Sequence, residues 1–181
     1  QCRAQVAKWR GQGLTVGFVP TMGALHDGHL SIVRQSLAAG HKTIVSIFVN
    51  PKQFGPNEDF AAYPRIVNED AELLKAAGAD VLFAPEVGEM YAQGFATSVR
   101  VSGLTDYLCG PSRPGHFEGV ATVVTKLLNQ AQADEAFFGE KDWQQLQVIK
   151  RLTADLDIPT RITGALIVRE EDGLALSSRN R

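Results

Sequence analysis

The 181-residue chain has only two cysteines, Cys2 and Cys109, and no long apolar run. The spacing of these cysteines matches no zinc or redox motif, which predicts two free thiols in a reducing, cytoplasmic setting. No stretch approaches the roughly 18 apolar residues of a membrane-spanning helix, and no signal peptide is recognisable. The sequence therefore argues against a disulfide scaffold and against a membrane partner.

Excess basic charge is also missing. Lys and Arg together number 18 against 20 Asp and Glu, so the formal net charge is −2. Proteins that bind nucleic acid usually carry a basic face, so no nucleic-acid partner is expected and a small charged metabolite is the more natural ligand. The 44% hydrophobic and 21% charged content is typical of a globular domain, and the length suffices for a sizeable core.

Short apolar segments alternate with helical patterns along the whole chain. Strands are predicted over residues 14–19, 42–49, 80–83, 135–138 and 160–163, with further extended segments over 97–101 and 165–168. Helices are predicted over residues 3–9, 28–39, 68–77, 119–130 and 142–155. Such alternation predicts an α/β fold with a parallel sheet covered on both faces, whose ligands bind beyond the carboxyl ends of the strands. No linker divides the chain, so one domain is expected over residues 1–181.

Two histidines stand at the start of a predicted helix. Residues 20–29 read P-T-M-G-A-L-H-D-G-H and place His26 and His29 three residues apart, directly after the first strand. Backbone N–H groups at a helix N-terminus attract phosphate, imidazoles can donate hydrogen bonds to phosphate oxygens, and Gly28 lets a ligand come close to the backbone. The pattern predicts a nucleoside triphosphate site; the alternative is a pair of surface histidines in a loop.

Two further loops carry polar side chains beside proline or glycine. In F-V-N-P-K-Q-F, residues 48–54, the amides of Asn50 and Gln53 and the ring of Phe54 suit a small polar ligand, although a capped proline turn is the alternative. In R-P-G-H-F-E-G, residues 113–119, Arg113 and His116 either line the site or belong to an ordinary loop before a helix.

Two more polar loops follow the later strands. In G-E-K-D-W-Q-Q, residues 139–145, Lys141 can neutralise phosphate and Asp142 can accept from ribose hydroxyls, with Gln145 one turn later. The alternative is a charged helix start, but a lysine there opposes the helix-dipole preference. In L-S-S-R, residues 176–179, two hydroxyls and Arg179 can bind triphosphate oxygens, the arginine in bidentate fashion. A serine-rich loop without a ligand is the alternative.

Together these stretches resemble the pantothenate synthetase (pantoate–β-alanine ligase) family. The matching segments are P-T-M-G-A-L-H-D-G-H at 20–29, F-V-N-P-K-Q-F at 48–54, R-P-G-H-F-E-G-V at 113–120, F-G-E-K-D-W-Q-Q at 138–145 and L-S-S-R-N at 176–180. The His-x-Gly-His pattern alone indicates only the wider HIGH-motif nucleotidyltransferase superfamily, with its Rossmann-like doubly wound parallel sheet. The other four segments make the resemblance specific.

The resemblance implies a carbon–nitrogen ligase of pantothenate and coenzyme A biosynthesis. ATP and pantoate would give pantoyl adenylate and pyrophosphate, and β-alanine would then give pantothenate and AMP. Catalysis would consist mainly of positioning and charge stabilisation, with Mg²⁺ bridging the phosphates of ATP. The resemblance also implies a homodimer.

The resemblance further assigns roles to residues. The ATP site would consist of Pro20, Thr21, Met22, Gly23, Ala24, Leu25, His26, Asp27, Gly28, His29, Gly139, Glu140, Lys141, Asp142, Val168, Leu176, Ser177, Ser178 and Arg179. The catalytic residues among them would be His29, as proton donor to the departing pyrophosphate, with His26, Lys141 and Arg179. Pantoate would bind at Gln53, Gln145, Met22, Asn50 and His116, with Arg113 as a further lining residue. No firm metal ligand is implied, although Glu69 and Asp70 would help with the metal.

The family carries a smaller C-terminal lid domain after the serine-rich loop, and the resemblance covers only the nucleotide-binding domain. Reduced activity is therefore expected of this domain alone, because lid closure excludes water and completes the site. Two other functions stay open: a cytidylyl- or adenylyltransferase that makes a dinucleotide-like product, and a non-catalytic nucleotide-binding module. The acidic balance and the lack of an anticodon-binding region argue against a tRNA-charging enzyme.

Overall fold

The computed structural model describes residues 1–55, 58 and 60–180, apart from the side chain of Arg179. Within this described part, five parallel strands form one sheet in the order β3-β2-β1-β4-β5. The strands are β1 (Val16–Thr21), β2 (Lys42–Ile47), β3 (Val81–Phe83), β4 (Glu135–Gly139) and β5 (Arg161–Ala165). The strand order reverses between β1 and β4, which makes the sheet doubly wound, as the sequence predicts.

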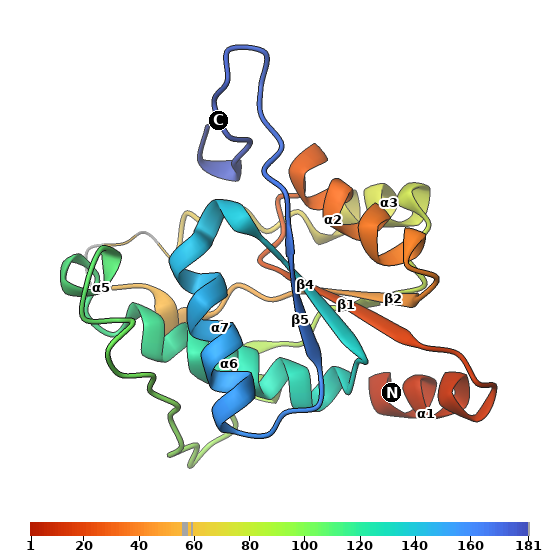
Figure 1. Ribbon diagram of the computed structural model, residues 1–181, viewed down its shortest axis with the longest axis horizontal. Coiled ribbons are helices and arrows are strands. Elements are labelled where there is room, and N and C mark those ends of the chain that lie inside the picture. Colours follow the sequence, from red (N-terminus) through yellow and green to blue (C-terminus); the bar gives the residue numbers. More distant parts are fainter. Residues whose placement is uncertain (56–57, 59, 181) are drawn as a thin grey trace.

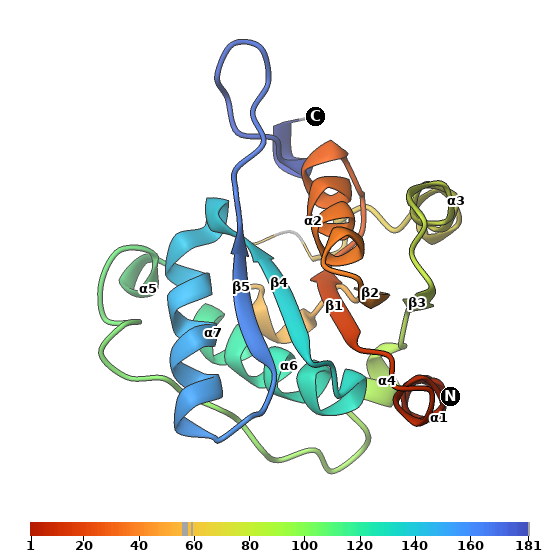
Figure 2. The ribbon, with the colours of Figure 1, turned by 45° about the vertical axis from the view of Figure 1, so that its right-hand side comes forward.

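Helices cover both faces of this sheet (Figures 1 and 2). One face carries α1 (Cys2–Gly11), α6 (His116–Ala131) and α7 (Trp143–Asp155). The opposite face carries α2 (Asp27–Ala38) and α3 (Val67–Ala77). The connections contain the short helices α4 (Val87–Met90) and α5 (Cys109–Ser112) and the 3₁₀ turns η1 (Pro51–Gln53), η2 (Glu140–Asp142) and η3 (Ser178–Asn180).

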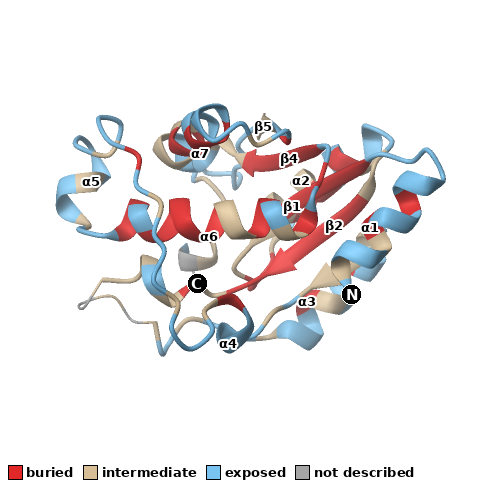
Figure 3. Cartoon of the chain, turned by 90° about the horizontal axis from the view of Figure 1, so that it is seen from below, coloured by how far each residue is buried: buried red, intermediate tan, exposed pale blue. Residues whose placement is uncertain are grey.

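Each face of the sheet has its own apolar core, because successive side chains of a strand point to opposite faces. Phe18 of β1 packs with the cluster that includes Leu128 of α6 and Ile149 of α7. Its neighbour Val19 packs on the other side, with Val33 of α2. Figure 3 shows the buried residues concentrated in the central strands and along α6. The sheet is therefore held rigidly from both sides, and its strand ends are fixed in space.

The five predicted strands and five predicted helices are present, with ends that shift by up to three residues. Strand β1 begins at Val16 because the Leu14 N–H bonds to Trp9 O and closes the turn after α1. The extended segment predicted over residues 97–101 is wrong as a strand. Instead the Val99 N–H donates to Thr122 Oγ1 at 2.9 Å, which ties this segment to α6.

The segment after β5 also differs from the prediction. Strand β5 ends at Ala165, and Leu166 is exposed rather than part of an extended strand over residues 165–168. The chain then runs outward and returns, with an antiparallel bridge between Arg169 and Ala175. Figure 1 shows this excursion rising above the carboxyl ends of the strands. None of the helices in the described part of the chain combines the length and apolarity needed to cross a membrane.

Candidate active site

A cavity of about 250 Å³ opens beyond the carboxyl ends of β1 and β4, where the strand order reverses. Ligands of doubly wound sheets bind at this place. Its walls come from the start of α2, from η1 and α6, from the turn between β4 and α7, and from the chain after β5. The sequence-predicted residues that line it are Pro20, Thr21, Met22, His26, Gly28, His29, Gln53, Arg113, His116, Gly139, Lys141, Asp142, Gln145, Val168, Leu176, Ser177 and Ser178.

Two histidine rings cap the beginning of α2. Nδ1 of His26 accepts the backbone N–H of Gly28 at 3.1 Å, and Nδ1 of His29 accepts the backbone N–H of His26 at 3.4 Å. A backbone N–H can only donate, so the proton of each neutral ring is on Nε2. From the sequence, the backbone N–H groups of this turn are expected to bind phosphate. In the structure two of them donate to the imidazole rings, and the donor on each ring is its Nε2–H.

Gly28 is required by the packing of this cap. A Cβ atom at this position would lie 2.9 Å from both Cε1 and Nδ1 of His26, which is closer than real Cβ contacts. It would also lie 3.5 Å from Cβ of Leu176, so the serine-rich segment returns to this same turn. The space beside Gly28, predicted from the sequence to admit a ligand, is filled by the His26 ring.

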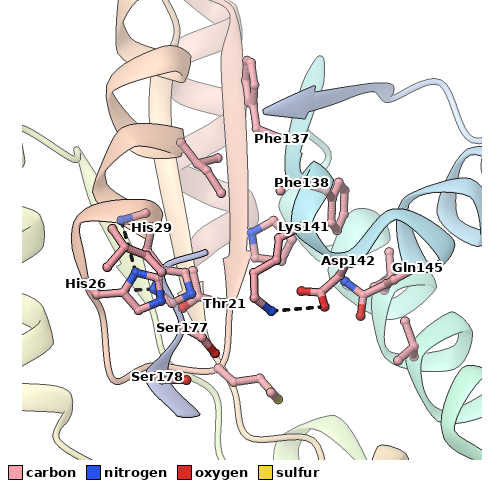
Figure 4. A pocket seen from close by; sticks show the side chains of 18 of the residues that line it. Thr21, His26, His29, Phe137, Phe138, Lys141, Asp142, Gln145, Ser177 and Ser178 are labelled. Carbon is pink, nitrogen blue, oxygen red and sulfur yellow. Dashed lines mark hydrogen bonds and ion pairs between the residues drawn. The ribbon is translucent and has the colours of Figure 1, made fainter. Parts of the chain in front are cut away.

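The electrostatic surroundings of His29 keep its ring neutral. Burial, as the largest cause, and the nearby His26 and Lys141 together lower the pKa of His29 to about 3. Its ring centroid lies 4.0 Å from that of His26, with a tilt of 37°. Figure 4 shows the two imidazoles on the α2 side of the cavity, with Lys141 on the other side. At neutral pH, His29 therefore contributes a neutral N–H donor and no charge.

Lys141 supplies positive charge at the opposite wall. Its Nζ lies 3.5 Å from Oδ1 of Asp142, and the side chains are 39% and 64% exposed. A pair this open contributes little, so Lys141 can turn toward an anion at small cost. Ser177 and Ser178 line a third side, and the Leu176 N–H bonds to Val168 O at 3.0 Å to hold their segment. The side chain of Arg179, predicted to bind triphosphate, lies outside the described residues.

The far side of the cavity carries a chain of polar groups. Gln53 directs Nε2 to Sδ of Met22 at 3.2 Å, a weak acceptor. His116 contacts Gln53 O through Nδ1 at 2.9 Å and Arg113 Nη1 through Nε2 at 3.0 Å. Arg113 also donates from Nε and Nη2 to the carboxylate of Glu58 at 2.6 and 2.9 Å. This bidentate bond lowers the pKa of Glu58 to about 2.

Some predicted contacts need correction. Asn50 is 1% exposed and does not line the cavity; it holds Gln53 from behind, with its Nδ2 3.0 Å from Gln53 Oε1. Among the described side chains, the other predicted ATP-site residues that do not line it are Gly23, Ala24, Leu25, Asp27 and Glu140. These residues form the loops and the helix start around the cavity, but they do not form its lining.

Asp70 has a structural role that the sequence did not suggest. It is fully buried, and its two carboxylate oxygens accept the backbone N–H groups of Ala24 at 2.9 Å and Leu25 at 2.8 Å. Glu69 lies on the exposed side of α3. Among the described residues, no group of three or more His, Cys, Asp or Glu side chains is arranged to hold a metal ion. Both carboxylate oxygens of Asp70 are thus engaged by the backbone, and a metal role of Glu69 and Asp70 stays a prediction.

Sequence reasoning missed most of the apolar wall. The additional lining residues are Ile32, Phe48, Tyr63, Val120, Val123, Val124, Leu127, Phe137, Phe138, Leu166 and Ile167. The helical spacing of Val120, Val123, Val124 and Leu127 indicates a buried face, but spacing alone does not separate a core face from a cavity wall. Phe54, expected as a wall, instead packs edge-on against Phe60 and Tyr63.

Comparison with known proteins decides the family. The model of the family described as pantoate-beta-alanine ligase matches residues 1–181, the whole chain. The chain belongs to the pantoate–β-alanine ligase family. A pantothenate synthetase of Paramagnetospirillum magneticum is 63% identical over 178 residues, which cover 98% of this chain and 63% of that protein.

Solved structures of this family show the same architecture. The pantothenate synthetase of Thermus thermophilus superposes with a TM-score of 0.90 at 54% identity, over 97% of this chain and 64% of that one. Pantoate–β-alanine ligase from Francisella tularensis, complexed with beta-gamma ATP and β-alanine, gives a TM-score of 0.89 at 43% identity, over 93% of this chain and 65% of that one. The chain thus spans less than two thirds of the length of these relatives.

A more distant likeness fixes the fold class. Tyrosyl-tRNA synthetase from Archaeoglobus fulgidus, complexed with L-tyrosine, has a TM-score of 0.64 at 15% identity, over 98% of this chain and 62% of that one. At this identity the likeness concerns the fold alone. The α/β fold with a parallel sheet, which the sequence predicts, is thus shared with that enzyme.

Proposed function

We propose that this chain carries out the ATP-dependent condensation of pantoate with β-alanine through a pantoyl adenylate. The observation that carries the proposal is that one cavity joins two kinds of wall. The first kind of lining group is imidazole, ammonium or hydroxyl, from His26, His29, Lys141, Ser177 and Ser178, and the second is the amides of Gln53 and Gln145. The first suits a triphosphate and the second a small hydroxy acid. The Francisella tularensis relative, solved with beta-gamma ATP and β-alanine, supports ATP and β-alanine as substrates.

In the first step, a carboxylate oxygen of pantoate attacks the α-phosphorus of ATP. The bond from that phosphorus to the bridging oxygen breaks, and pyrophosphate leaves with the electron pair. Negative charge builds on the leaving phosphates, where Lys141 and the Nε2–H donors of His26 and His29 lie. Preorganised donors of this kind act most strongly in a partly enclosed site.

In the second step, the neutral amine of β-alanine attacks the carbonyl carbon of the adenylate. The carbon–nitrogen bond forms, AMP leaves with the electron pair of the carbon–oxygen bond, and the nitrogen gives up one proton to water. The chain would help mainly by holding the acyl group against Gln53 and Gln145 while the amine approaches. Adenylation makes this attack feasible because AMP is a far better leaving group than the oxide ion that an unactivated carboxylate would have to release.

His29 acts in this proposal as a hydrogen-bond donor. Its pKa of about 3 means that, without a nucleotide charge beside it, the ring is not a charged imidazolium ready to release a proton at neutral pH. A bound triphosphate would raise that pKa, because negative charge nearby favours the charged form. Proton transfer to pyrophosphate, the role implied by the resemblance, therefore depends on the nucleotide being bound.

Mg²⁺ belongs to the proposal as a companion of ATP. The described residues do not supply a metal-binding cluster, and both carboxylate oxygens of Asp70 are taken by backbone N–H groups. The ligands of the ion would be phosphate oxygens and water, as is common for Mg²⁺ with nucleotides.

The deciding experiment is ATP–pyrophosphate exchange by the 181-residue chain with and without pantoate. Pantoate-dependent exchange that is lost in His29→Ala would support adenylate formation at this site. A matched control is His41→Ala, because His41 lies away from the cavity and bonds to Thr15 and Glu135. Loss of exchange in both variants would indicate damage to the fold, which circular dichroism would detect.

The same assay separates the alternatives. A nucleotidyltransferase of the wider superfamily would respond to nicotinate mononucleotide or phosphopantetheine instead of pantoate. A non-catalytic module would bind ATP in calorimetry without any exchange. Binding of both ATP and pantoate with no exchange would mean that this domain is a competent binder that needs the lid domain of its family for turnover.

We also propose a homodimer in the cytoplasm. The family resemblance supports the homodimer, and light scattering on the purified chain tests this oligomeric state. Two cysteines without a disulfide, Cys2 and Cys109, agree with a reducing compartment. Fractionation of the source cell tests the cytoplasmic location.

A further inference from the structure

A buried amide lies directly behind Gln53. Asn50 donates from Nδ2 to Gln53 Oε1 at 3.0 Å and to Gly119 O at 3.1 Å. Its Oδ1 accepts the hydroxyl of Tyr91 at 2.7 Å and the backbone N–H of Lys52 at 3.3 Å. At 1% exposure this side chain has no access to substrate. Of the four partners that these bonds join to Asn50, Gln53 is the one that lines the cavity.

The direction of every bond in this chain is fixed. The N–H of Lys52 can only donate, so its partner on Asn50 is the oxygen. The carbonyl of Gly119 can only accept, so its partner is the nitrogen. The atom of Gln53 that faces this nitrogen must then be Oε1. Since Oε1 is occupied, Gln53 presents Nε2–H to the cavity and serves there as a donor.

Tyr91 makes the shortest of these bonds, and its ring is held in place. The ring lies 5.0 Å from that of Phe95 and 6.1 Å from that of Phe48, and Nζ of Lys52 is 5.3 Å from its centroid. Burial raises the pKa of Tyr91 to about 12, so the hydroxyl keeps its proton at all ordinary pH values. Tyr91 is thus a permanent donor to Asn50. Without it, Oδ1 would keep only the long bond from Lys52.

We propose that Tyr91 is a positioning residue that acts through Asn50 to hold the Gln53 amide with its Nε2–H toward the cavity, so that Gln53 recognises an acceptor oxygen of pantoate. The weak contact to Met22 Sδ marks the place that this oxygen would take. The ligand identity rests on the function proposed above. The orientation of the amide rests only on the contacts of Asn50.

The first test is Tyr91→Phe, which removes the hydroxyl and keeps the ring. Pantoate binding measured by calorimetry should weaken about fivefold to tenfold, the usual effect of losing one buried hydrogen bond, while ATP affinity changes less than about twofold. Tyr107→Phe is the matched control, because Tyr107 is 72% exposed and is not a lining residue. Equal pantoate affinity in wild type and Tyr91→Phe would overturn the proposal. A parallel loss of ATP affinity would also overturn it, since it would point to general loosening of the fold.

A double-mutant cycle tests whether Tyr91 acts through Gln53. In a Gln53→Ala background, Tyr91→Phe should have no further effect on pantoate affinity, because the amide that it orients is gone. Additive losses would show that Tyr91 acts by another route and would contradict the proposal.

The orientation is also measurable without any ligand. The side-chain amide ¹H–¹⁵N signals of Asn50 and Gln53 should shift in Tyr91→Phe and stay in place in Tyr107→Phe. Unchanged signals would refute the positioning role whatever the substrate is. Shifted signals in a chain that binds no pantoate would support the positioning role and reject the proposed function, so the two failures are distinguishable.

Discussion

The rings of His26 and His29 lie 4.0 Å apart at the first turn of α2, and Nδ1 of each accepts a backbone N–H of that same turn. The positive end of the helix is thereby extended through two neutral imidazoles to their Nε2–H groups. A single change in either ring would affect both the helix cap and the phosphate wall of the cavity. The turn is thus structural and functional at once, which gives testable consequences.

The titration of His29 is the first of these consequences. We expect its ring to stay neutral, as the Nε2–H tautomer, in the empty protein from pH 8 down to about pH 4, because burial and the nearby His26 and Lys141 lower its pKa to about 3. Long-range ¹H–¹⁵N spectra distinguish the tautomers, and the spectrum of His29→Ala assigns the signal. Addition of ATP should raise the pKa. A His29 that titrates near 6.5 in the empty protein would contradict this account.

The same shift makes a contribution to stability that depends on pH. Between about pH 6.5 and 3 the unfolded chain binds a proton at His29 that the folded chain does not bind. Stability from this group is therefore present above pH 6.5 and is lost as the pH falls through that window. Urea unfolding at pH 7 and pH 4.5 should show that His29→Gln gains stability relative to wild type at the lower pH. A constant difference would contradict the prediction.

Gly28→Ala should damage ATP binding more than stability. The new Cβ would approach the His26 ring to 2.9 Å and force it away from the cap. Loss of one hydrogen bond to a charged group predicts ATP binding weaker by about tenfold or more. Gly11→Ala is the control, since nothing lies within 4 Å of a Cβ there. Calorimetry measures ATP binding by both variants. Unchanged ATP affinity in Gly28→Ala would show that the position of His26 is unimportant for the nucleotide.

Asp70→Asn should destabilise the fold by about 2–3 kcal/mol, because an amide cannot accept the N–H groups of both Ala24 and Leu25 as the carboxylate does. Glu69→Gln, on the exposed side of α3, should stay within about 0.5 kcal/mol of wild type. Both are measured by urea unfolding in EDTA, so no metal contributes. An Asp70→Asn variant of normal stability that requires more Mg²⁺ for pyrophosphate exchange would support the metal role instead.

The layers of the fold were predictable because local patterns and tertiary contacts agree. The β-branched run after Lys42 and the turn glycine after α3, Gly78, mark their elements without help from the rest of the chain. The segment over residues 97–101 misled the prediction because its alternation is suitable for a strand. Such a segment becomes a strand only if it pairs with the edge of a sheet. Here the Val99 N–H donates to Thr122 of α6 instead.

The site was predictable where its residues are close in sequence. His26, Gly28 and His29 form their cap within a single turn, so the motif carries its own geometry. The contacts of Asp70 and Tyr91 were not predictable in this way. The partners of Asp70 lie 45 and 46 residues away, and the partner of Tyr91 lies 41 residues away. Nothing in the local sequence reveals such a contact, and a buried carboxylate reads as an ordinary acid of a helix.

Gly119 links the fold to the amide wall of the cavity. A Cβ at this position would lie 2.2 Å from the carbonyl oxygen of Lys52 and 2.7 Å from the backbone nitrogen of Gln53. Only a glycine lets α6 approach η1 this closely, and the Gly119 carbonyl then accepts from Asn50. The sequence R-P-G-H-F-E-G thus ends on a residue that sets where Gln53 lies.

Gly119→Ala should therefore push η1 away from α6. Overpacking against backbone predicts a loss of about 1–3 kcal/mol in the free energy of unfolding, even though alanine favours a helix by about 1 kcal/mol over glycine. Pantoate affinity should fall more than ATP affinity, because the displaced residue is Gln53 and the histidine cap is untouched. Gly88→Ala, with nothing within 4 Å of its Cβ, is the control. Equal losses of both affinities would show that η1 does not position the pantoate wall separately from the nucleotide wall.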